Sequence, residues 1–197
     1  MQRIFLIALA LVFVVGIASA QDSVRLAYFD AGKIAMKNGK YDEAERLFRS
    51  AIKEADSAGK QDDIYAQSLS YLGRVYWYKA KYAEAEPLIK RAIELEEKVE
   101  GTEGTNVAAM LGSLASLYHD QGKLAEAESL FKRCLKIEEK AFGPNHREVA
   151  TTVHNLARLY AAQGQFVEAE ALYRRSLQIQ EAHTVNRGGL SENGKTE

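Results

Sequence analysis

The sequence predicts an all-α fold, a right-handed α-solenoid of about four helix-turn-helix repeats with eight helices. Composition, an internal repeat, and apolar residues at helical spacing within each repeat predict it. Of the 197 residues, 47% are hydrophobic and 27% charged, which is typical of a globular chain. Ala, Leu, Glu and Lys are frequent and only two prolines occur, so helix is favoured over strand.

Four segments of the chain align with one another at nearly constant spacing. They lie at 39–45, 80–86, 122–128 and 164–170, at intervals of 41, 42 and 42 residues, and the third reads Gly-Lys-Leu-Ala-Glu-Ala-Glu. A fixed period in this range indicates supersecondary units that stack on their neighbours. We therefore expect one domain over 21–182, with repeats at about 24–61, 62–103, 104–145 and 146–182.

An apolar stripe with helical periodicity precedes each aligned segment, and a second one follows it. In the second repeat the first stripe is Leu69, Leu72, Gly73 and Tyr76; the first repeat has the weaker Tyr28, Ala31, Gly32 and Ala35. This spacing predicts two amphipathic helices per repeat. We expect helices at about 24–38, 41–58, 62–80, 83–99, 105–121, 124–141, 146–163 and 166–182. The small residues allow the two helices of a pair to approach closely.

These stripes resemble the tetratricopeptide repeat (TPR), with its Leu-Gly/Ala-x-x-Tyr and Ala-x-x-x-Phe positions. The run 142–152, Phe-Gly-Pro-Asn-His-Arg-Glu-Val-Ala-Thr-Thr, is similar to the longer repeats of kinesin light chains. The resemblance covers about 24–182 and implies a surface that binds a protein or peptide. The first repeat departs from the pattern because it lacks the apolar Leu and the Tyr of its first helix.

The first twenty residues have the pattern of a secretory signal peptide. Arg3 precedes an apolar run of 14 residues over 4–17, and Ala18-Ser19-Ala20 forms a cleavage site. The run is shorter than the roughly 20 residues that span a bilayer. We expect a periplasmic or secreted protein cleaved near Ala20, without a membrane span in the mature chain; an uncleaved anchor is the alternative. Residues 183–197 are predicted to be a disordered tail.

The sequence shows no pattern of catalysis, cofactor binding or metal binding. The 26 basic and 27 acidic residues nearly balance, so nucleic acid is not an expected partner. Carboxylates in runs such as 94–98 are interpreted as solvated helix faces. His146 and His154 are eight residues apart, about 12 Å along a helix, too far to share a metal.

The single Cys134 aligns with Ala51, Ala92 and Ser176, so we interpret it as a small residue in a helix interface. A reactive or intermolecular thiol is the alternative.

In stacked helix pairs, the first helix of each pair lines the concave surface, and its residues not needed for packing are available for binding. The candidates are Gln67, Ser70, Tyr71, Arg74, Tyr78, Ser113, Ser116, His119, Asp120, Thr151, His154, Asn155 and Arg158. Arg74 and Arg158 are suited to pairing with carboxylates. Tyr71, Trp77 and Tyr78 supply aromatic area; covering the neighbouring repeat is the alternative for Trp77 and Tyr78.

The resemblance implies that Asn155, which matches a position where the family often uses Asn, holds peptide backbone. We expect a non-catalytic adaptor or scaffold that needs no cofactor. The alternative is a structural subunit that assembles through the ends of the solenoid, near Leu172 and Leu177. No polar capping helix is visible after residue 182, so we expect weak self-association through that end unless the tail covers it.

Overall fold

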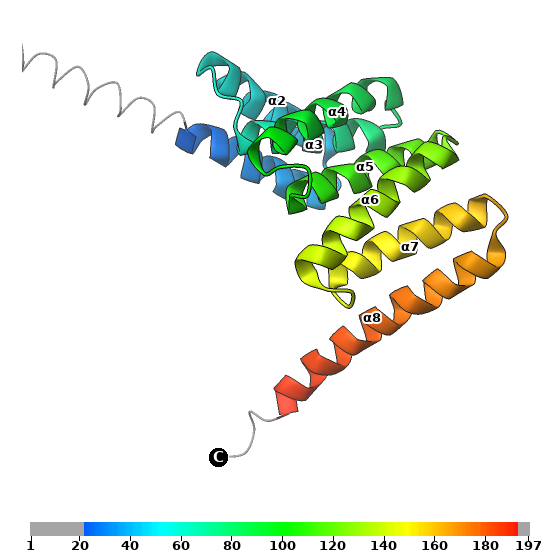
Figure 1. Ribbon diagram of the computed structural model, residues 1–197. Coiled ribbons are helices and arrows are strands. Elements are labelled where there is room, and N and C mark those ends of the chain that lie inside the picture. Colours follow the sequence, from blue (N-terminus) through cyan, green and yellow to red (C-terminus); the bar gives the residue numbers. More distant parts are fainter. Residues whose placement is uncertain (1–21, 193–197) are drawn as a thin grey trace, which may run out of the picture. The chain divides into compact units, whose positions relative to one another are not determined.

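A computed structural model of the chain describes residues 22–192, with side chains for residues 22–183 (Figure 1). These residues form eight helices and no strand, as the sequence predicted. The chain divides after Val99 into two compact units. Each unit contains two helix pairs, and each is described below by itself.

The first unit contains a helix over 22–37, α2 (Tyr41–Ser57), α3 (Asp63–Tyr78) and α4 (Tyr82–Val99). The Phe29 ring of the first helix lies 6.1 Å from the ring of Phe48 on α2 and 5.6 Å from that of Tyr71 on α3. The helix over 22–37 therefore packs against both helices that follow it. In turn, α3 packs against α2 and α4.

The second unit contains α5 (Thr105–Asp120), α6 (Leu124–Phe142), α7 (Arg147–Ala162) and α8 (Phe166–Glu192). Each of these helices packs against the next one in the chain, and α5 also contacts α7. Val149 and Val153 of α7 are fully buried and pack with Ile179 of α8.

Each helix pair is closed by the tight turn that the aligned segments predict. The backbone N–H of Gly39 bonds to the carbonyl of Met36 at 3.0 Å, and that of Lys40 to the carbonyl of Ala35 at 2.9 Å. This pattern places residue 39 in the left-handed region, where its φ is 72° and glycine is favoured. The second repeat has Ala80 at this position, with φ 56° and the same hydrogen-bond pattern.

The predicted helix bounds agree with the structure to within two residues, except at the end of the last helix. We expected that helix to end near 182 and a disordered tail to follow, but α8 continues to Glu192. No proline interrupts the chain here, so the helix can continue, and it does so through Gly188 and Gly189 although glycine lowers helix propensity. Residues 193–197 and the predicted signal peptide lie outside the described residues.

In the first repeat, the buried stripe differs from the expected one. Phe29 is 4% exposed, whereas Tyr28 and Ala31 are half-buried. Gly32 and Ala35 are buried as expected. Phe29 takes a core position because the first helix packs on α2 and α3 together, which requires a wider apolar face than one stripe.

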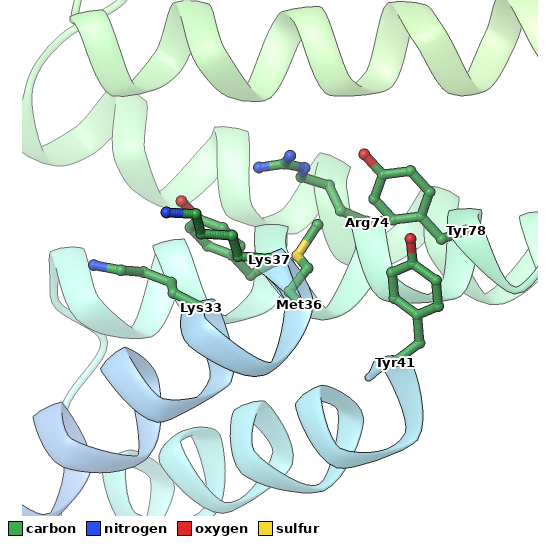
Figure 2. Close-up of a pocket in the computed structure, with 7 residues that line it drawn as sticks. Lys33, Met36, Lys37, Tyr41, Arg74 and Tyr78 are labelled. Carbon is green, nitrogen blue, oxygen red and sulfur yellow. The ribbon is translucent and has the colours of Figure 1, made fainter. Parts of the chain in front are cut away.

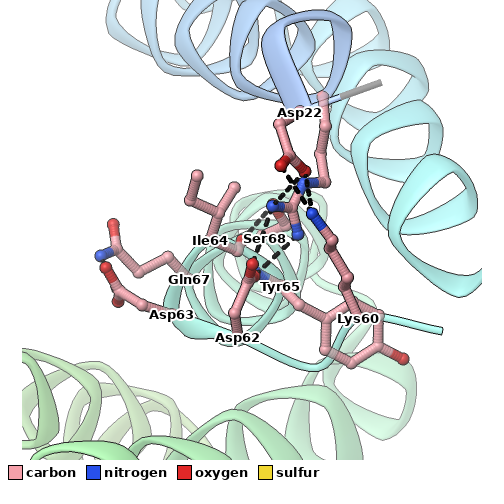
Figure 3. A network of polar contacts seen from close by, with 9 residues as sticks. Asp22, Lys60, Asp62, Asp63, Ile64, Tyr65, Gln67 and Ser68 are labelled. Atoms are coloured by element: carbon pink, nitrogen blue, oxygen red, sulfur yellow. Dashed lines mark hydrogen bonds and ion pairs between the residues drawn. The ribbon is translucent and has the colours of Figure 1, made fainter. Parts of the chain in front are cut away.

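A polar network ties the first helix to the α2–α3 turn (Figure 3). The buried Arg25 guanidinium donates to both carboxylate oxygens of Asp62, each at 2.7 Å. Asp62 also accepts a hydrogen bond from the backbone N–H of Tyr65 and so caps α3. Burial opposes ionisation of Asp62, but these hydrogen bonds outweigh it and lower its pKa. Lys60 donates to Asp22 at 2.6 Å beside this pair.

The close approach of paired helices leaves no room for a side chain at Gly73. A β-carbon built there would lie 2.6 Å from Cγ1 of Ile89 and 3.1 Å from the carbonyl oxygen of Ala85, both on α4. At Gly112 of α5, by contrast, a β-carbon would meet only Sγ of Cys134, at 3.6 Å, which is ordinary contact. Gly73 and Gly112 therefore provide a contrast, one crowded and one with room, for testing the packing.

We predict that Gly73→Ala lowers the free energy of unfolding by about 1–2 kcal/mol, since the cost of overpacking exceeds the gain in helix propensity. Gly112→Ala is expected to raise it by about 0.5–1 kcal/mol, because only the propensity gain applies. Urea unfolding followed by circular dichroism measures both. Equal changes of the same sign in the two variants would contradict the packing argument.

Candidate binding surfaces

A pocket of about 410 Å³ lies in the first unit, between the helix over 22–37, the start of α2, and α3 (Figure 2). Its lining residues are Lys33, Met36, Lys37, Tyr41, Tyr71, Arg74 and Tyr78. Three of them are cationic and three are tyrosines.

Three of the five candidates predicted on α3 meet in this pocket, and two do not. Tyr71, Arg74 and Tyr78 line it. Gln67 is half-buried and donates to Oδ1 of Asp63 at 2.6 Å. Ser70 is only 5% exposed, so its expected availability to a partner is corrected. The reason is that α3 packs against helices on both sides, which buries a broader face than the single predicted stripe.

Aromatic contacts hold the pocket's side chains in place. The Tyr71 ring lies 5.6 Å from Phe29 and 5.3 Å from Phe48, and the Arg74 guanidinium lies 5.1 Å from the Tyr71 centroid. Figure 2 shows Tyr78 beside Tyr41, and their stacked rings are 5.1 Å apart. Tyr78 therefore packs against the preceding repeat and also stays 47% exposed.

Lys33, Met36, Lys37 and Tyr41 were not predicted as site residues. They belong to the first repeat, whose weak resemblance to the repeat pattern gave no reliable division between packing and surface positions. A signal was nevertheless present: Lys33, Met36 and Lys37 follow i, i+3, i+4 spacing and so share a helix face.

In the second unit the remaining candidates lie on α5 and α7. Thr151, His154 and Arg158 are exposed and Asn155 is half-buried, and their spacing puts them on one face of α7. His154 packs against Tyr173 of α8, with ring centroids 5.3 Å apart. The four candidates predicted on α7 therefore lie together on one face of that helix.

The candidates on α5 make local hydrogen bonds. The hydroxyls of Ser113 and Ser116 donate to the carbonyls four residues earlier, those of Ala109 and Gly112. Nδ1 of His119 lies 3.1 Å from Oδ1 of Asp120 at the end of the helix. The two serines are thus engaged with their own helix, as serines inside helices commonly are.

Two carboxylates are buried at equivalent positions of successive repeats, although one of them lies in the run expected to be solvated. Glu96 of α4 has no exposed surface, and Glu138 of α6 is 7% exposed. Burial raises the pKa of Glu138, although hydrogen bonds from Thr152 and Cys134 favour its charged form. Charge alone was therefore misleading for the face of α4 that carries Glu96.

Cys134 occupies the small-residue position of the third repeat and is 1% exposed. Its Sγ lies 3.6 Å from Oγ1 of Thr152. Burial, followed by the nearby Glu138, raises the pKa of the thiol to about 12. These features agree with the structural interpretation of this cysteine.

Within the part of the chain that the structure describes, no three His, Cys, Asp or Glu side chains gather as a metal-binding group. None of the helices described there combines the length and apolar character that crossing a membrane requires.

Stacked antiparallel helix pairs with a repeated glycine turn define the chain as a helical-repeat protein. The family model described as tetratricopeptide repeat matches residues 23–98 and 106–182. The chain therefore belongs to the tetratricopeptide repeat family, whose fold generally mediates protein–protein interaction. No curated protein matches the sequence.

Solved structures with kinesin light chain-like repeats share the fold. BtubC (BKLC) from P. vanneervenii has a TM-score of 0.75 and 23% identity; the match covers 83% of this chain and 66% of BtubC. A Podosopora anserina protein assigned to the kinesin light chains, with nearly identical TPR-like repeats, has a TM-score of 0.68 and 24% identity, with 79% and 74% covered. A point variant of that protein gives 0.67 at the same identity and coverage.

We predict that the Cys134 thiol of the folded protein reacts with iodoacetamide at pH 8 roughly a hundredfold more slowly than that of the urea-unfolded chain. Burial blocks access and the raised pKa keeps the thiol protonated. Mass spectrometry of samples quenched over time measures the rate. Complete labelling of the folded protein within the dead time of the unfolded control would restore the reactive-thiol interpretation.

Proposed function

We propose that this protein is a non-catalytic adaptor or scaffold that binds a protein or peptide partner on the concave side of its helix pairs. Support comes first from the family, whose fold generally mediates protein–protein interaction. The observation that carries the proposal for this chain is the pocket between the first two repeats, where predicted residues of α3 meet four more from the first repeat.

The second unit supports the same proposal through the exposed face of α7. Arg158 is exposed, and no carboxylate among the described residues pairs with it. Asn155 lies beside it on the helix with its amide available to donate to and accept from a peptide backbone. These side chains would hold an extended segment by charge and by hydrogen bonds.

A structural subunit that assembles through its ends is the second candidate. It is favoured by the apolar surface on α8, where Phe166 is 71%, Val167 79% and Leu177 55% exposed. Large exposed apolar side chains often mark interfaces between proteins. Under this alternative the partner is another copy of the chain or a second envelope component.

We predict that affinity capture with the full chain, from the cells that make it, recovers a partner that the Arg74→Ala and Arg158→Ala variants lose. Truncating an arginine at the centre of an interface is expected to weaken binding about tenfold or more. Quantitative mass spectrometry measures the recovery. Lys53→Ala and Lys136→Ala, exposed cations on the second helices of their pairs, are the matched controls.

The same experiment separates the two candidates. Recovery of only the chain itself, unchanged in the arginine variants and lost in Leu177→Glu, would reject the adaptor and favour the assembling subunit. A partner retained equally by all the variants would reject the binding surfaces proposed above.

We further propose that the protein works outside the cytoplasm, as a periplasmic or secreted protein. Arg3, the apolar run over 4–17 and the Ala18-Ser19-Ala20 site support this, although they lie outside the described residues. The intact mass of the protein purified from its native cells is expected to correspond to a chain beginning at Gln21. A mass that includes Met1 would show that the segment is retained and favour the anchor.

A further inference from the structure

The helix over 22–37 exposes apolar side chains at repeat positions that α7 buries. Val24 is 45% exposed, whereas its equivalent Val149 has no exposed surface. Ile34 is 63% exposed, whereas its equivalent Leu159 has none. The difference follows from the neighbours, because α7 packs against the preceding α6, while no helix precedes the one over 22–37 among the described residues.

The last described helix, α8, exposes the positions through which α6 contacts α7. Leu135 of α6 packs against a buried cluster that includes Val149 of α7. Its equivalent on α8, Leu177, is 55% exposed. Glu138 of α6 is 7% exposed, whereas the equivalent Gln180 is exposed. The outer face of α8 is therefore the face that α6 uses to hold the next helix.

The polar contacts between α6 and α7 have counterparts on the same two faces. Glu128 of α6 accepts a hydrogen bond from the side chain of Gln163, just after α7, at 3.1 Å. Its equivalent on α8, Glu170, has a side chain that is 63% exposed, against 25% for Glu128. Asn38, just after the helix over 22–37, stands at the position of Gln163 and carries an amide that can donate to Glu170.

We propose that the helix over 22–37 of one copy of this chain docks on α8 of a second copy, as α7 docks on α6 within one chain. In that arrangement Val24 faces Leu177, as Val149 faces Leu135. A second copy is the occupant that these observations favour, because the chain carries both sides of this interface and already packs the equivalent sides together.

The two faces differ from each other, so the contact is heterologous and each copy has one face for each of two neighbours. The proposal rests on the second candidate function, the assembling subunit, and specifies its partner and its two contact faces. It places no contact on the concave side, so it is compatible with an adaptor.

The test uses the protein purified from its native cells and two variants, each with a charge on one face only. Ile34→Glu alters the helix over 22–37, and Leu177→Glu alters α8. Sedimentation velocity measures the mass of each variant, and of an equimolar mixture of the two, from about 5 to about 200 μM.

Two further variants are controls, because they place the same charge on the same helices outside the proposed faces. Leu26→Glu lies at the position of Thr151, which is exposed on α7. Gln178→Glu adjoins Leu177 but lies at the position of Lys136, which is exposed on α6. Both controls are expected to associate as the unaltered protein does.

The mass of the unaltered protein is expected to rise with concentration beyond that of two copies, because each contact leaves a free face at both ends. Ile34→Glu and Leu177→Glu are each expected to weaken association at least about tenfold. Their mixture should form a complex of one copy of each and no larger species, since it retains one intact face of each kind. This recovery would also show that both variants are folded.

A protein that stays monomeric over the whole range would overturn the proposal. Association that Ile34→Glu leaves unchanged and Leu177→Glu abolishes would overturn it in favour of two α8 faces meeting symmetrically. A mixture that forms no complex of the two variants would also count against the head-to-tail contact. If the protein is monomeric while Arg74→Ala and Arg158→Ala still lose a native partner, this proposal falls and the adaptor function stands.

Discussion

The close approach of the two helices in each pair is the constraint on which the rest of the structure depends. It is possible because a glycine or alanine of the first helix lies under a large side chain of the second, as Gly73 lies under Ile89 and Gly32 under Phe48. A short distance between helix axes in turn requires a tight connection, which the left-handed turn residue supplies. The close contact between a small and a large residue requires the tight turn, and the turn in turn requires that contact. These three features therefore recur together, at a period of about 42 residues.

A second, polar interaction recurs between one pair and the next within each unit. The Tyr76 hydroxyl of α3 donates to Glu45 of α2 at 3.2 Å, and the Tyr160 hydroxyl of α7 donates to Glu128 of α6 at 3.3 Å. Both glutamates are the last residue of an aligned segment. A hydrogen bond from Lys79 is the main reason that the pKa of Glu45 is lowered, and one from Lys132 plays that part for Glu128. The tyrosine therefore both fills the core and connects successive repeats.

Most of the fold followed from periodicity, because spacing alone determines which residues share a helix face. The turns and the buried role of Cys134 followed from alignment of the repeats. The candidate site was less predictable. Spacing shows that Lys33, Met36 and Lys37 share a helix face, but they meet the side chains of α3 only through packing between repeats, which no pattern within one repeat encodes. The predictions that Ser70 is available to a partner and that Glu96 is solvated were wrong for the same reason. Each residue lies on a helix face that is polar by composition but covered by a neighbouring element. The end of α8 was missed because the polar stretch with Gly188 and Gly189 after residue 182 has low helix propensity, whereas the helix continues through it.

The helices described in each unit contact their neighbours along the chain or the helix after next, as α5 contacts α7. Such a topology has low contact order, so little loop-closure entropy must be lost before stabilising contacts form. Each helix pair can dock as soon as it leaves the ribosome or a translocation channel, without waiting for distant sequence.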